Sequence, residues 1–250
     1  MADTSLNDSY NLVLKPSEEK HVLLDLKKGI RTFDISLEEN ASLDLEILNE
    51  EDFKEEGGLQ GKISLAPSSR LQGTMVDFSS GNFKADISID VNERASVSFD
   101  LAASASGKDN KVFDIKVSHP QKEGKSHVKM MGVLSSSASL VFLGSSSIAK
   151  GAKKTWTRQE GKIADLSKDG KGEVSPILRI DEDDVKASHG AALGKIPDDS
   201  LFYLMSRGLS EKEAMSLMTI GYLKPIVEEI QEESLKKRLV SFVEDGGYLK

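Results

Sequence analysis

The chain has 250 residues with 33 basic and 41 acidic side chains, which give a formal net charge of -8 and an isoelectric point near 5.2. This acidic balance argues against nucleic acid as a partner. The absence of cysteine excludes disulfides, thiolate zinc sites and an iron–sulfur cluster held by cysteines of this chain alone. Because no apolar stretch is long enough to span a membrane and the start is polar, we expect a cytoplasmic protein without membrane contact.

Short segments of alternating apolar and polar residues occupy the chain from residue 21 to residue 180. Phe33, Ile35 and Leu37 illustrate the pattern, which is typical of strands with one apolar face and one solvated face. The same alternation recurs over residues 43–47, 83–91, 97–101, 113–117 and 128–134. So many strands with short turns are compatible with a sandwich, a barrel or a solenoid, and no fixed-period motif selects among them.

From residue 197 onward the pattern becomes helical. Residues 197–200 predict the start of a first helix, which we expect to end at Gly208. Ser210 and Glu213 form a capping box for a second helix, predicted to end near Gly221. Apolar residues at helical spacing predict a third and a fourth helix. They are Leu223, Ile226, Val227 and Ile230, and then Leu235, Leu239, Phe242 and Val243.

This change of pattern divides the chain into two predicted parts. A β body covers residues 1–196 and begins with a polar lead-in over residues 1–20, which we expect to be frayed or extended. A small helical domain covers residues 197–250. Neither part carries a recognisable catalytic motif, since the serine runs lack a nucleophile elbow and residues 124–126 lack the first glycine of a phosphate-binding loop. We therefore expect a protein that is not an enzyme.

The four histidines are the remaining candidates for chemistry. His21, His119 and His127 lie among polar neighbours without metal-ligand spacing, so we expect all three at the surface. His189 differs, because in an extended strand it falls on the apolar face. The residues that share this face are Val185, Ala187, Ala191 and Leu193. From this spacing alone, a buried and hydrogen-bonded His189 is the simplest interpretation.

A signature of a known family lies where the β pattern gives way to the helical one. Residues 175–180, Ser-Pro-Ile-Leu-Arg-Ile, precede residues 183–194, Asp-Asp-Val-Lys-Ala-Ser-His-Gly-Ala-Ala-Leu-Gly. The pair resembles the SufB/SufD family, in which a Pro-x-Leu-Glu-Ile strand leads to Asp-Asp-Val-Lys-Cys-Ser-His-Gly-Ala. The likeness continues into residues 201–210 and 220–222, and altogether it covers residues 125–245.

The resemblance implies a right-handed parallel β-helix with a small C-terminal α-helical domain. It also implies a scaffold subunit for iron–sulfur cluster assembly that pairs with a SufB-like protein. Clusters would form at the pair interface, where His189 occupies the position of a SufD histidine ligand. His189 is thus the candidate cluster or metal ligand, and no cofactor is expected on this chain alone.

The same resemblance implies that the helical domain binds a SufC-like ABC ATPase, which completes a SufBCD complex. The positions that match this region of the family are Leu201, Tyr203, Leu204, Arg207, Gly208, Gly221 and Tyr222. The chain departs from the family at Ala187, where cysteine is common, and this favours a SufD role over a SufB role. We also expect it to lack the N-terminal helical domain that many relatives carry.

Three alternatives stay open at this point. The chain is compatible with a SufB-like homo-oligomeric scaffold that lacks the cysteine, and in isolation with a homodimer. It is also compatible with a β-helix protein that acts on polysaccharide, although paired catalytic carboxylates and an export signal are not visible in the sequence. The third is a β-helical oligomer without a chemical role.

Overall fold

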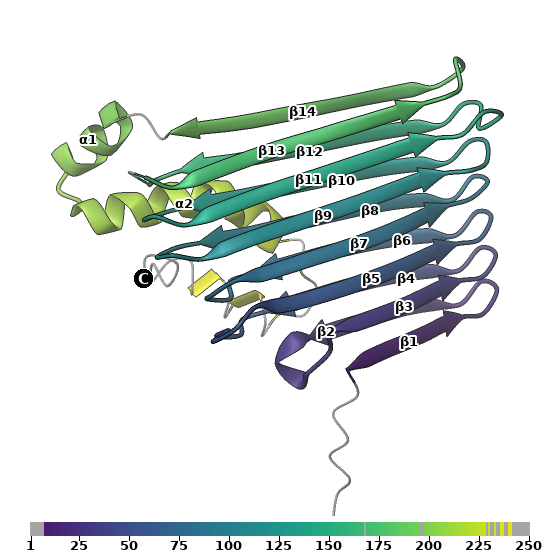
Figure 1. The fold of residues 1–250 in the computed structure, drawn as a ribbon, viewed down its shortest axis with the longest axis horizontal. Helices are drawn as coiled ribbons and strands as arrows, with labels where there is room; N and C mark the ends of the chain where they lie inside the picture. The colour runs from purple at the N-terminus through teal and green to yellow at the C-terminus, as the bar shows by residue number, and fades with distance from the viewer. Residues whose placement is uncertain are drawn as a thin grey trace, which may run out of the picture.

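The chain forms two seven-stranded parallel sheets that lie face to face (Figure 1). The computed structural model describes residues 8–167, 169–195 and 198–228, together with residues 230, 233, 236, 237, 240 and 241. Sheet A has the order β1-β3-β5-β7-β9-β11-β13, and sheet B has the order β14-β12-β10-β8-β6-β4-β2. Because successive strands alternate between the sheets and every pairing is parallel, the chain winds into a flattened parallel β-helix. The predicted fold class, mainly β with helices at the C-terminal end, is confirmed.

Each turn of the β-helix, here called a rung, takes one strand from each sheet. The strands of sheet A are β1 (Ser9–Leu14), β3 (Thr32–Leu37), β5 (Gly57–Leu65), β7 (Phe83–Val91), β9 (Asn110–His119), β11 (Ser139–Ile148) and β13 (Lys171–Ile180). Those of sheet B are β2 (Glu19–Asp25), β4 (Ser42–Asn49), β6 (Arg70–Asp77), β8 (Ser96–Ala105), β10 (Lys125–Leu134), β12 (Trp156–Asp165) and β14 (Lys186–Lys195). A short 3-10 helix, η1 (Leu26–Lys28), follows β2.

The strands begin earlier than the sequence pattern predicted. β1 pairs with β3 from Ser9 to Leu14, and β2 begins at Glu19. The lead-in over residues 1–20, expected to be frayed or extended, is extended and paired over Ser9–Leu14, and residues 1–7 lie outside the described residues. The physical reason is that Leu14 is buried in the core and Tyr10 and Leu12 pack against it, whereas the residues that alternate with them on this edge strand are exposed.

The core fills the space between the two sheets. Most inward side chains from Leu14 on β1 to Ile163 on β12 form one apolar cluster. Aromatic side chains stack along its axis: the ring centroids of Phe83 and Phe113 are 6.0 Å apart, and those of Phe113 and Phe142 are 5.9 Å apart. Each such pair contributes about 0.5–1.5 kcal/mol beyond the burial of its area. The stack keeps neighbouring rungs in register.

A column of left-handed residues forms the corners where the strands of sheet A from β1 to β11 lead into sheet B. The residues with φ between 55 and 62° in this column are Ser17, Asn40, Ser68, Arg94, Glu123 and Lys154. Each donates its backbone N–H to a carbonyl of the following turn, as Ser68 does to Glu93 at 2.9 Å and Glu123 does to Lys153 at 2.8 Å. Because residues of such different types occupy the column, no repeat motif is visible in the sequence.

Two helices lie within the described residues, α1 (Asp198–Ser206) and α2 (Glu211–Val227). The predicted capping box is confirmed, since the Ser210 hydroxyl accepts from the Glu213 N–H and the Glu213 carboxylate accepts from the Ser210 N–H. The predicted end near Gly221 is wrong, because α2 continues to Val227 and joins the second and third predicted helices. Packing of Leu223 against sheet B outweighs the cost of about 1 kcal/mol for glycine in a helix.

Two further predictions, the fourth helix and the domain boundary, concern residues that are not described. The residues named for a fourth helix, Leu235, Leu239, Phe242 and Val243, lie outside the described residues, and so does the predicted domain boundary between residues 196 and 197. Among the described residues, no helix has the length and apolar character needed to span a membrane.

Helix α2 packs on the outer face of sheet B and not into the β-helix (Figure 1). A second apolar cluster forms there between the C-terminal half of α2 and outward-facing residues near the strand ends. Its members from α2 and beyond are Leu223, Ile226, Val227 and Ile230, and those from sheet B are Leu48, Val76, Ala102, Val133 and Ala164. This cluster attaches the helical segment to the end of sheet B nearest the C-terminal ends of its strands.

Candidate functional site

His189 lies on β14, the edge strand of sheet B, whose ladder partner is β12. In that ladder His189 is directly opposite Gln159, whose side chain is buried inside the β-helix. Residues opposite each other on neighbouring strands share a face, so His189 is on the interior side together with Ala191 and Leu193. The predicted parity is therefore correct. The expected burial is wrong, because His189 belongs to the last rung and is exposed.

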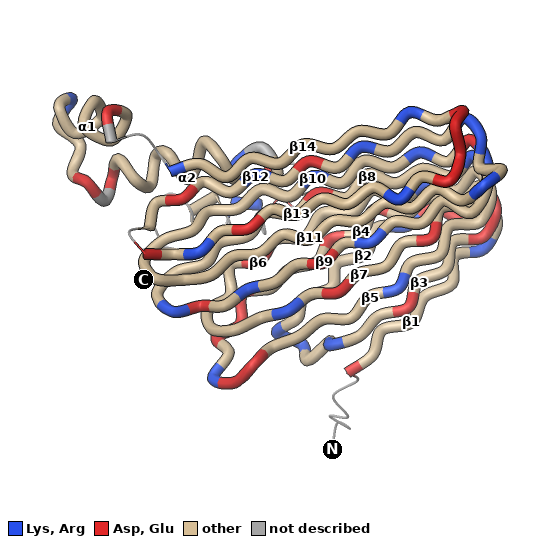
Figure 2. The backbone as a smooth tube through the Cα atoms, turned by 45° about the horizontal axis from the view of Figure 1, so that its top comes forward, with Lys and Arg blue, Asp and Glu red and all other residues tan. Residues whose placement is uncertain are grey.

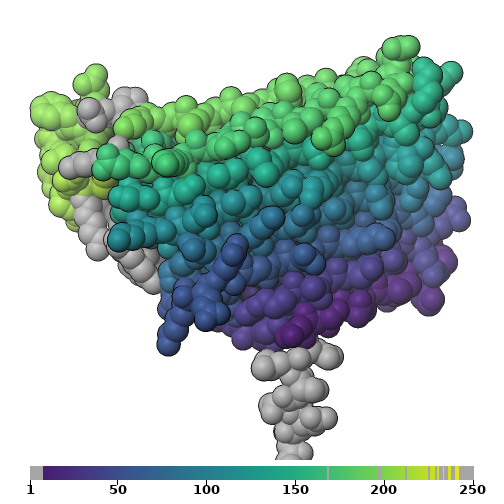
Figure 3. Space-filling model, viewed as in Figure 1, coloured from purple at the N-terminus to yellow at the C-terminus, as the bar shows by residue number. Residues whose placement is uncertain are grey.

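The rung formed by β13 and β14 leaves one end of the β-helix open. On β11 the inward residues are buried, whereas on β13 the corresponding positions are only half-buried or exposed. On the interior side Leu193 is 51% exposed and Ile180 is 41% exposed. Figure 3 shows this rung as the green upper edge of the molecule. An apolar surface bounded by two free strand edges is a template for another protein chain.

A chain of hydrogen bonds runs through the interior towards this open end. His119 Nε2 lies 2.8 Å from Ser126 Oγ, which lies 2.7 Å from Thr157 Oγ1. Thr157 donates to Ser146 Oγ at 3.0 Å, and Gln159 Nε2 donates to the same oxygen at 2.7 Å. All five side chains are essentially buried. The polar chain thus ends at Gln159, the residue beside His189.

His119 corrects the sequence analysis, which placed it at the surface. Its side chain is 1% exposed, because it is the last inward residue of β9 and the turn at Gly124 lies against it. Burial lowers the pKa of the His119 imidazole from 6.5 to about 4, so the ring is neutral at physiological pH. Alternation along β9 places His119 on the same face of the strand as Phe113 and Val117, and this signal was available in the sequence.

The other two histidines lie outside the β-helix, as predicted. His21 is exposed and its Nε2 is 3.4 Å from a carboxylate oxygen of Glu46, whereas half-buried His127 lies 2.9 Å from Glu160. Glu160 also forms an ion pair with Arg158. Its pKa is lowered to about 2, first by the hydrogen bond from Arg158 and then by that from His127. Both histidines lie on strands of sheet B other than the edge strand β14.

Comparison with known proteins identifies the family to which this chain belongs. A profile described as SUF system FeS cluster assembly, SufBD core domain, matches residues 14–222. The chain belongs to the SufBD family. The match covers both sheets and extends into α2, so the family's core domain includes the open rung and its histidine.

Individual relatives place the chain on the SufD side of the SufBD family. It is 40% identical over 138 residues to the iron–sulfur cluster assembly protein SufD of Bacillus subtilis, covering 55% of this chain and 32% of that relative. It is 31% identical over 109 residues to SufD of Escherichia coli, covering 44% and 26% respectively. A SufBD family protein of Pyrococcus horikoshii is 39% identical over 85 residues, which cover 33% of this chain and 19% of that relative. The chain matches about a third or less of each relative's length.

The positions that the SufBD resemblance assigned to ATPase binding fall into two groups. Leu201, Tyr203, Leu204, Arg207 and Gly208 belong to α1 and the turn after it, whereas Gly221 and Tyr222 belong to α2. Tyr222 faces sheet B, where Lys162 Nζ lies 4.5 Å from its ring centroid. Tyr203 is 56% exposed, and the Arg207 guanidinium lies 5.2 Å from its ring centroid. Their role in binding stays a prediction.

Further exposed apolar side chains lie on the same two helices as Tyr203 and Tyr222. Phe202 is 73% exposed, and Met205 on α1 and Leu217 on α2 are also exposed. The signal was present in the sequence, because Leu201, Phe202, Tyr203, Leu204 and Met205 are five consecutive apolar residues, too many for one buried face of a helix. These exposed residues on α1 and α2 are a second set of apolar side chains, on other elements than those of the open rung.

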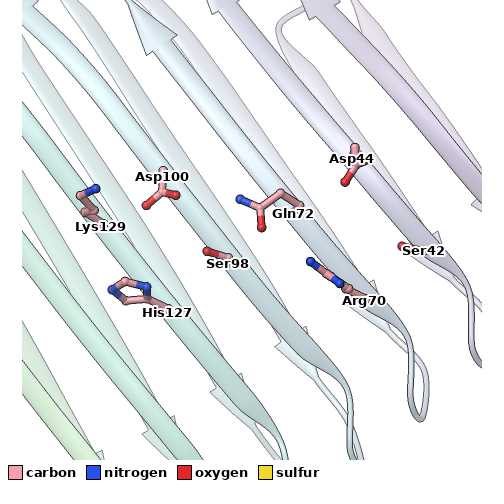
Figure 4. A pocket seen from close by; sticks show the side chains of 8 residues that line it. All are labelled: Ser42, Asp44, Arg70, Gln72, Ser98, Asp100, His127 and Lys129. Atoms are coloured by element: carbon pink, nitrogen blue, oxygen red, sulfur yellow. The ribbon is translucent and has the colours of Figure 1, made fainter. Parts of the chain in front are cut away.

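The outer face of sheet B carries a hollow of 670 Å³ lined by polar side chains (Figure 4). Its lining residues are Ser42, Asp44, Arg70, Gln72, Ser98, Asp100, His127 and Lys129. Acidic and basic residues are interspersed along the strands here and elsewhere (Figure 2). Within the described residues there is no group of three or more histidine, cysteine or acidic side chains that could hold a metal ion. We assign no chemistry to this hollow.

Proposed function

We propose that this chain is the SufD-type, non-catalytic half of a scaffold on which iron–sulfur clusters are assembled. The observation that carries the proposal is the uncovered last rung, where two free strand edges and exposed Leu193 and Ile180 share the interior side with His189. A surface of this kind favours the matching end of a second β-helix as its partner. The partner is a SufB-like protein, because the chain belongs to a family named for the SufB and SufD pair.

The cluster is the cargo of this scaffold and has to be held by groups from more than one chain. A cluster needs several protein ligands, most often thiolates, although histidine nitrogens replace two of them in one natural class. This chain has no cysteine, and at the open end it offers the single imidazole of His189. The available donor therefore fits a shared site, in which His189 supplies a nitrogen ligand and the partner supplies the sulfur ligands.

The apolar surface around Phe202 and Tyr203 is the proposed contact for a SufC-like ATPase. It lies on α1 and α2, at the end of the molecule where α2 is attached to sheet B (Figure 1). Because α2 is anchored to sheet B by Leu223, Ile226 and Val227, a force applied to the helices is transmitted to the strands. An ATPase bound there is therefore mechanically coupled to the β-helix.

Co-expression with SufB-like and SufC-like proteins from the same genome tests the proposal. Native mass spectrometry of the purified material measures which chains associate and in what stoichiometry. We expect a stable complex of all three proteins. A lone monomer under these conditions overturns the scaffold function, whereas a homodimer that excludes the SufB-like protein favours a homo-oligomeric scaffold built on the same free edges.

A further inference from the structure

Two complementary polar groups lie side by side at the open end, and neither has a partner. Gln159 Oε1 is buried and has no hydrogen bond within the described part of the chain. His189 is directly opposite Gln159 in the β12–β14 ladder, and its imidazole makes no hydrogen bond among the described residues. A buried carbonyl oxygen without a donor costs about 1–3 kcal/mol, so such an atom beside an imidazole is a signal for a contact made during function.

The interior hydrogen-bond chain ends at the NH₂ group of Gln159, which donates to Ser146 Oγ at 2.7 Å and leaves the amide oxygen without a donor. Because buried His119 is neutral, it carries a proton on one ring nitrogen, and Ser126 lies within hydrogen-bond distance of Nε2. The bonds then run from Ser126 to Thr157 and from Thr157 to Ser146. Ser146 Oγ accepts from the Gln159 NH₂ group, so the Gln159 oxygen is left at the other end of the amide.

The facing strand leaves room for the amide in this orientation. Gly144 on β11 lies across the interior from Gln159, and a Cβ atom at this position would come within 3.3 Å of Gln159 Oε1. The glycine therefore permits the amide oxygen to sit deep in the rung below His189. The Gln159 side chain is 1% exposed, and its oxygen is in a dry environment where a hydrogen bond is strong.

We propose that Gln159 is the positioning residue for His189, and that its Oε1 accepts the Nδ1–H of the imidazole. This bond turns the ring into the mouth of the β-helix and leaves the Nε2 lone pair directed towards the partner. Ligating histidines generally donate their second ring N–H to a carbonyl or carboxylate, which fixes the tautomer and the ring orientation. The use of Nε2 as a cluster ligand rests on the proposed function, whereas the hydrogen bond itself does not.

The tautomer of His189 tests the hydrogen bond without any cluster. An imidazole free in water prefers the Nε2–H form, so an acceptor for Nδ1–H reverses the preference. We would label the full chain with ¹⁵N-histidine and record long-range ¹H–¹⁵N spectra above the ordinary imidazole pKa of about 6.5. We expect His189 to be mainly Nδ1–H in the native chain and mainly Nε2–H in Gln159→Leu. Nε2–H in the native chain overturns the proposal.

Two further variants separate this contact from a general effect on folding. Gln72→Leu makes the same change on the outer face of sheet B, and we expect it to leave the His189 tautomer unchanged. Thr157→Val keeps the shape of the side chain but removes the hydroxyl that donates to Ser146, and we expect a mixture of tautomers. A His189 spectrum that is unaffected by both Gln159→Leu and Thr157→Val refutes the positioning role.

Cluster yield in the three-protein complex distinguishes the two proposals. If His189→Ala lowers the yield while Gln159→Leu leaves the tautomer unchanged, the positioning role fails and the scaffold function stands. If Gln159→Leu changes the tautomer while His189→Ala leaves the yield unchanged, the hydrogen bond is established and the ligand role of His189 fails. If the positioning role of Gln159 and the ligand role of His189 are both correct, we expect Gln159→Leu to lower the cluster yield less than His189→Ala does.

Discussion

Lys111 Nζ lies 2.6 Å from Asp77 Oδ1 inside the β-helix, and both side chains are completely buried. The ammonium group also donates to the carbonyl oxygens of Ser79 at 2.7 Å and Ser104 at 2.8 Å. The second Asp77 oxygen accepts from the Asn49 amide at 2.6 Å. All three ammonium hydrogens have acceptors, so the pair satisfies the condition under which buried charges are tolerated.

Replacing Lys111 by methionine should therefore destabilise the fold strongly. The change keeps most of the side-chain volume but leaves the Asp77 carboxylate buried without its cation, which costs about 3–5 kcal/mol. Denaturant unfolding followed by circular dichroism measures the loss. The double variant Lys111→Met with Asp77→Asn should recover much of it, since the buried charge is then gone. A loss below about 1 kcal/mol for the single variant contradicts this account.

His119 should make the stability fall as the pH is lowered from about 6.5 towards 4. Its folded-state pKa is lowered to about 4 by burial, so in this window the unfolded chain binds a proton that the folded chain does not. The free energy of unfolding then decreases by up to about 1.4 kcal/mol per pH unit. His119→Gln, which retains a donor for Ser126, should flatten the profile between pH 6.5 and 4.5, above the range of most carboxylates. An unchanged slope contradicts the prediction.

Leu193→Arg should prevent pairing at the open end without affecting the fold. Leu193 is 51% exposed in the isolated chain, so an arginine there has access to water, but at a contact with another chain its charge would be desolvated. We expect the dissociation constant for the SufB-like protein to rise at least about tenfold. Gln72→Arg, on the outer face of sheet B, is the matched control. Equal affinities for the two variants place the interface elsewhere.

His189→Ala should lower cluster yield severalfold and leave the complex intact. The side chain is exposed, so its removal creates no cavity and should change the melting temperature little. Iron and sulfide analysis of the complex, purified under anaerobic conditions, measures the yield. His21→Ala, which removes an exposed histidine at the opposite end of sheet B, should have no such effect. Equal yields in both variants remove His189 from the site.

Replacing Phe202 and Tyr203 together by alanine should abolish association with the SufC-like ATPase. Both side chains are more than half exposed, so their loss should not unfold α1 or detach α2, which is held by Leu223 and Ile226. Pairing with the SufB-like protein should persist, because the open rung is unchanged. Size-exclusion chromatography of the mixed proteins reads out both associations. Retention of the ATPase by this variant would assign its contact to another surface.

Local features of this protein were readable from the sequence because they depend on neighbours along the chain. The alternation at Phe33, Ile35 and Leu37 specified strands, and the capping box of Ser210 and Glu213 specified where α2 begins. The same alternation placed His189 on the interior side of its strand. The resemblance to the SufB/SufD family supplied the β-helix, which alternation by itself did not distinguish from a sandwich or a barrel.

Only the tertiary structure decided which of these residues meet. Lys111 and Asp77 are 34 positions apart in the sequence, and Gln159 and His189 come together through the register of β12 and β14. The exposure of His189 depends on its place in the last rung, which no local pattern records. Pairing and burial are set by contacts between rungs, and such contacts follow from the path of the whole chain and not from the residues adjacent in sequence.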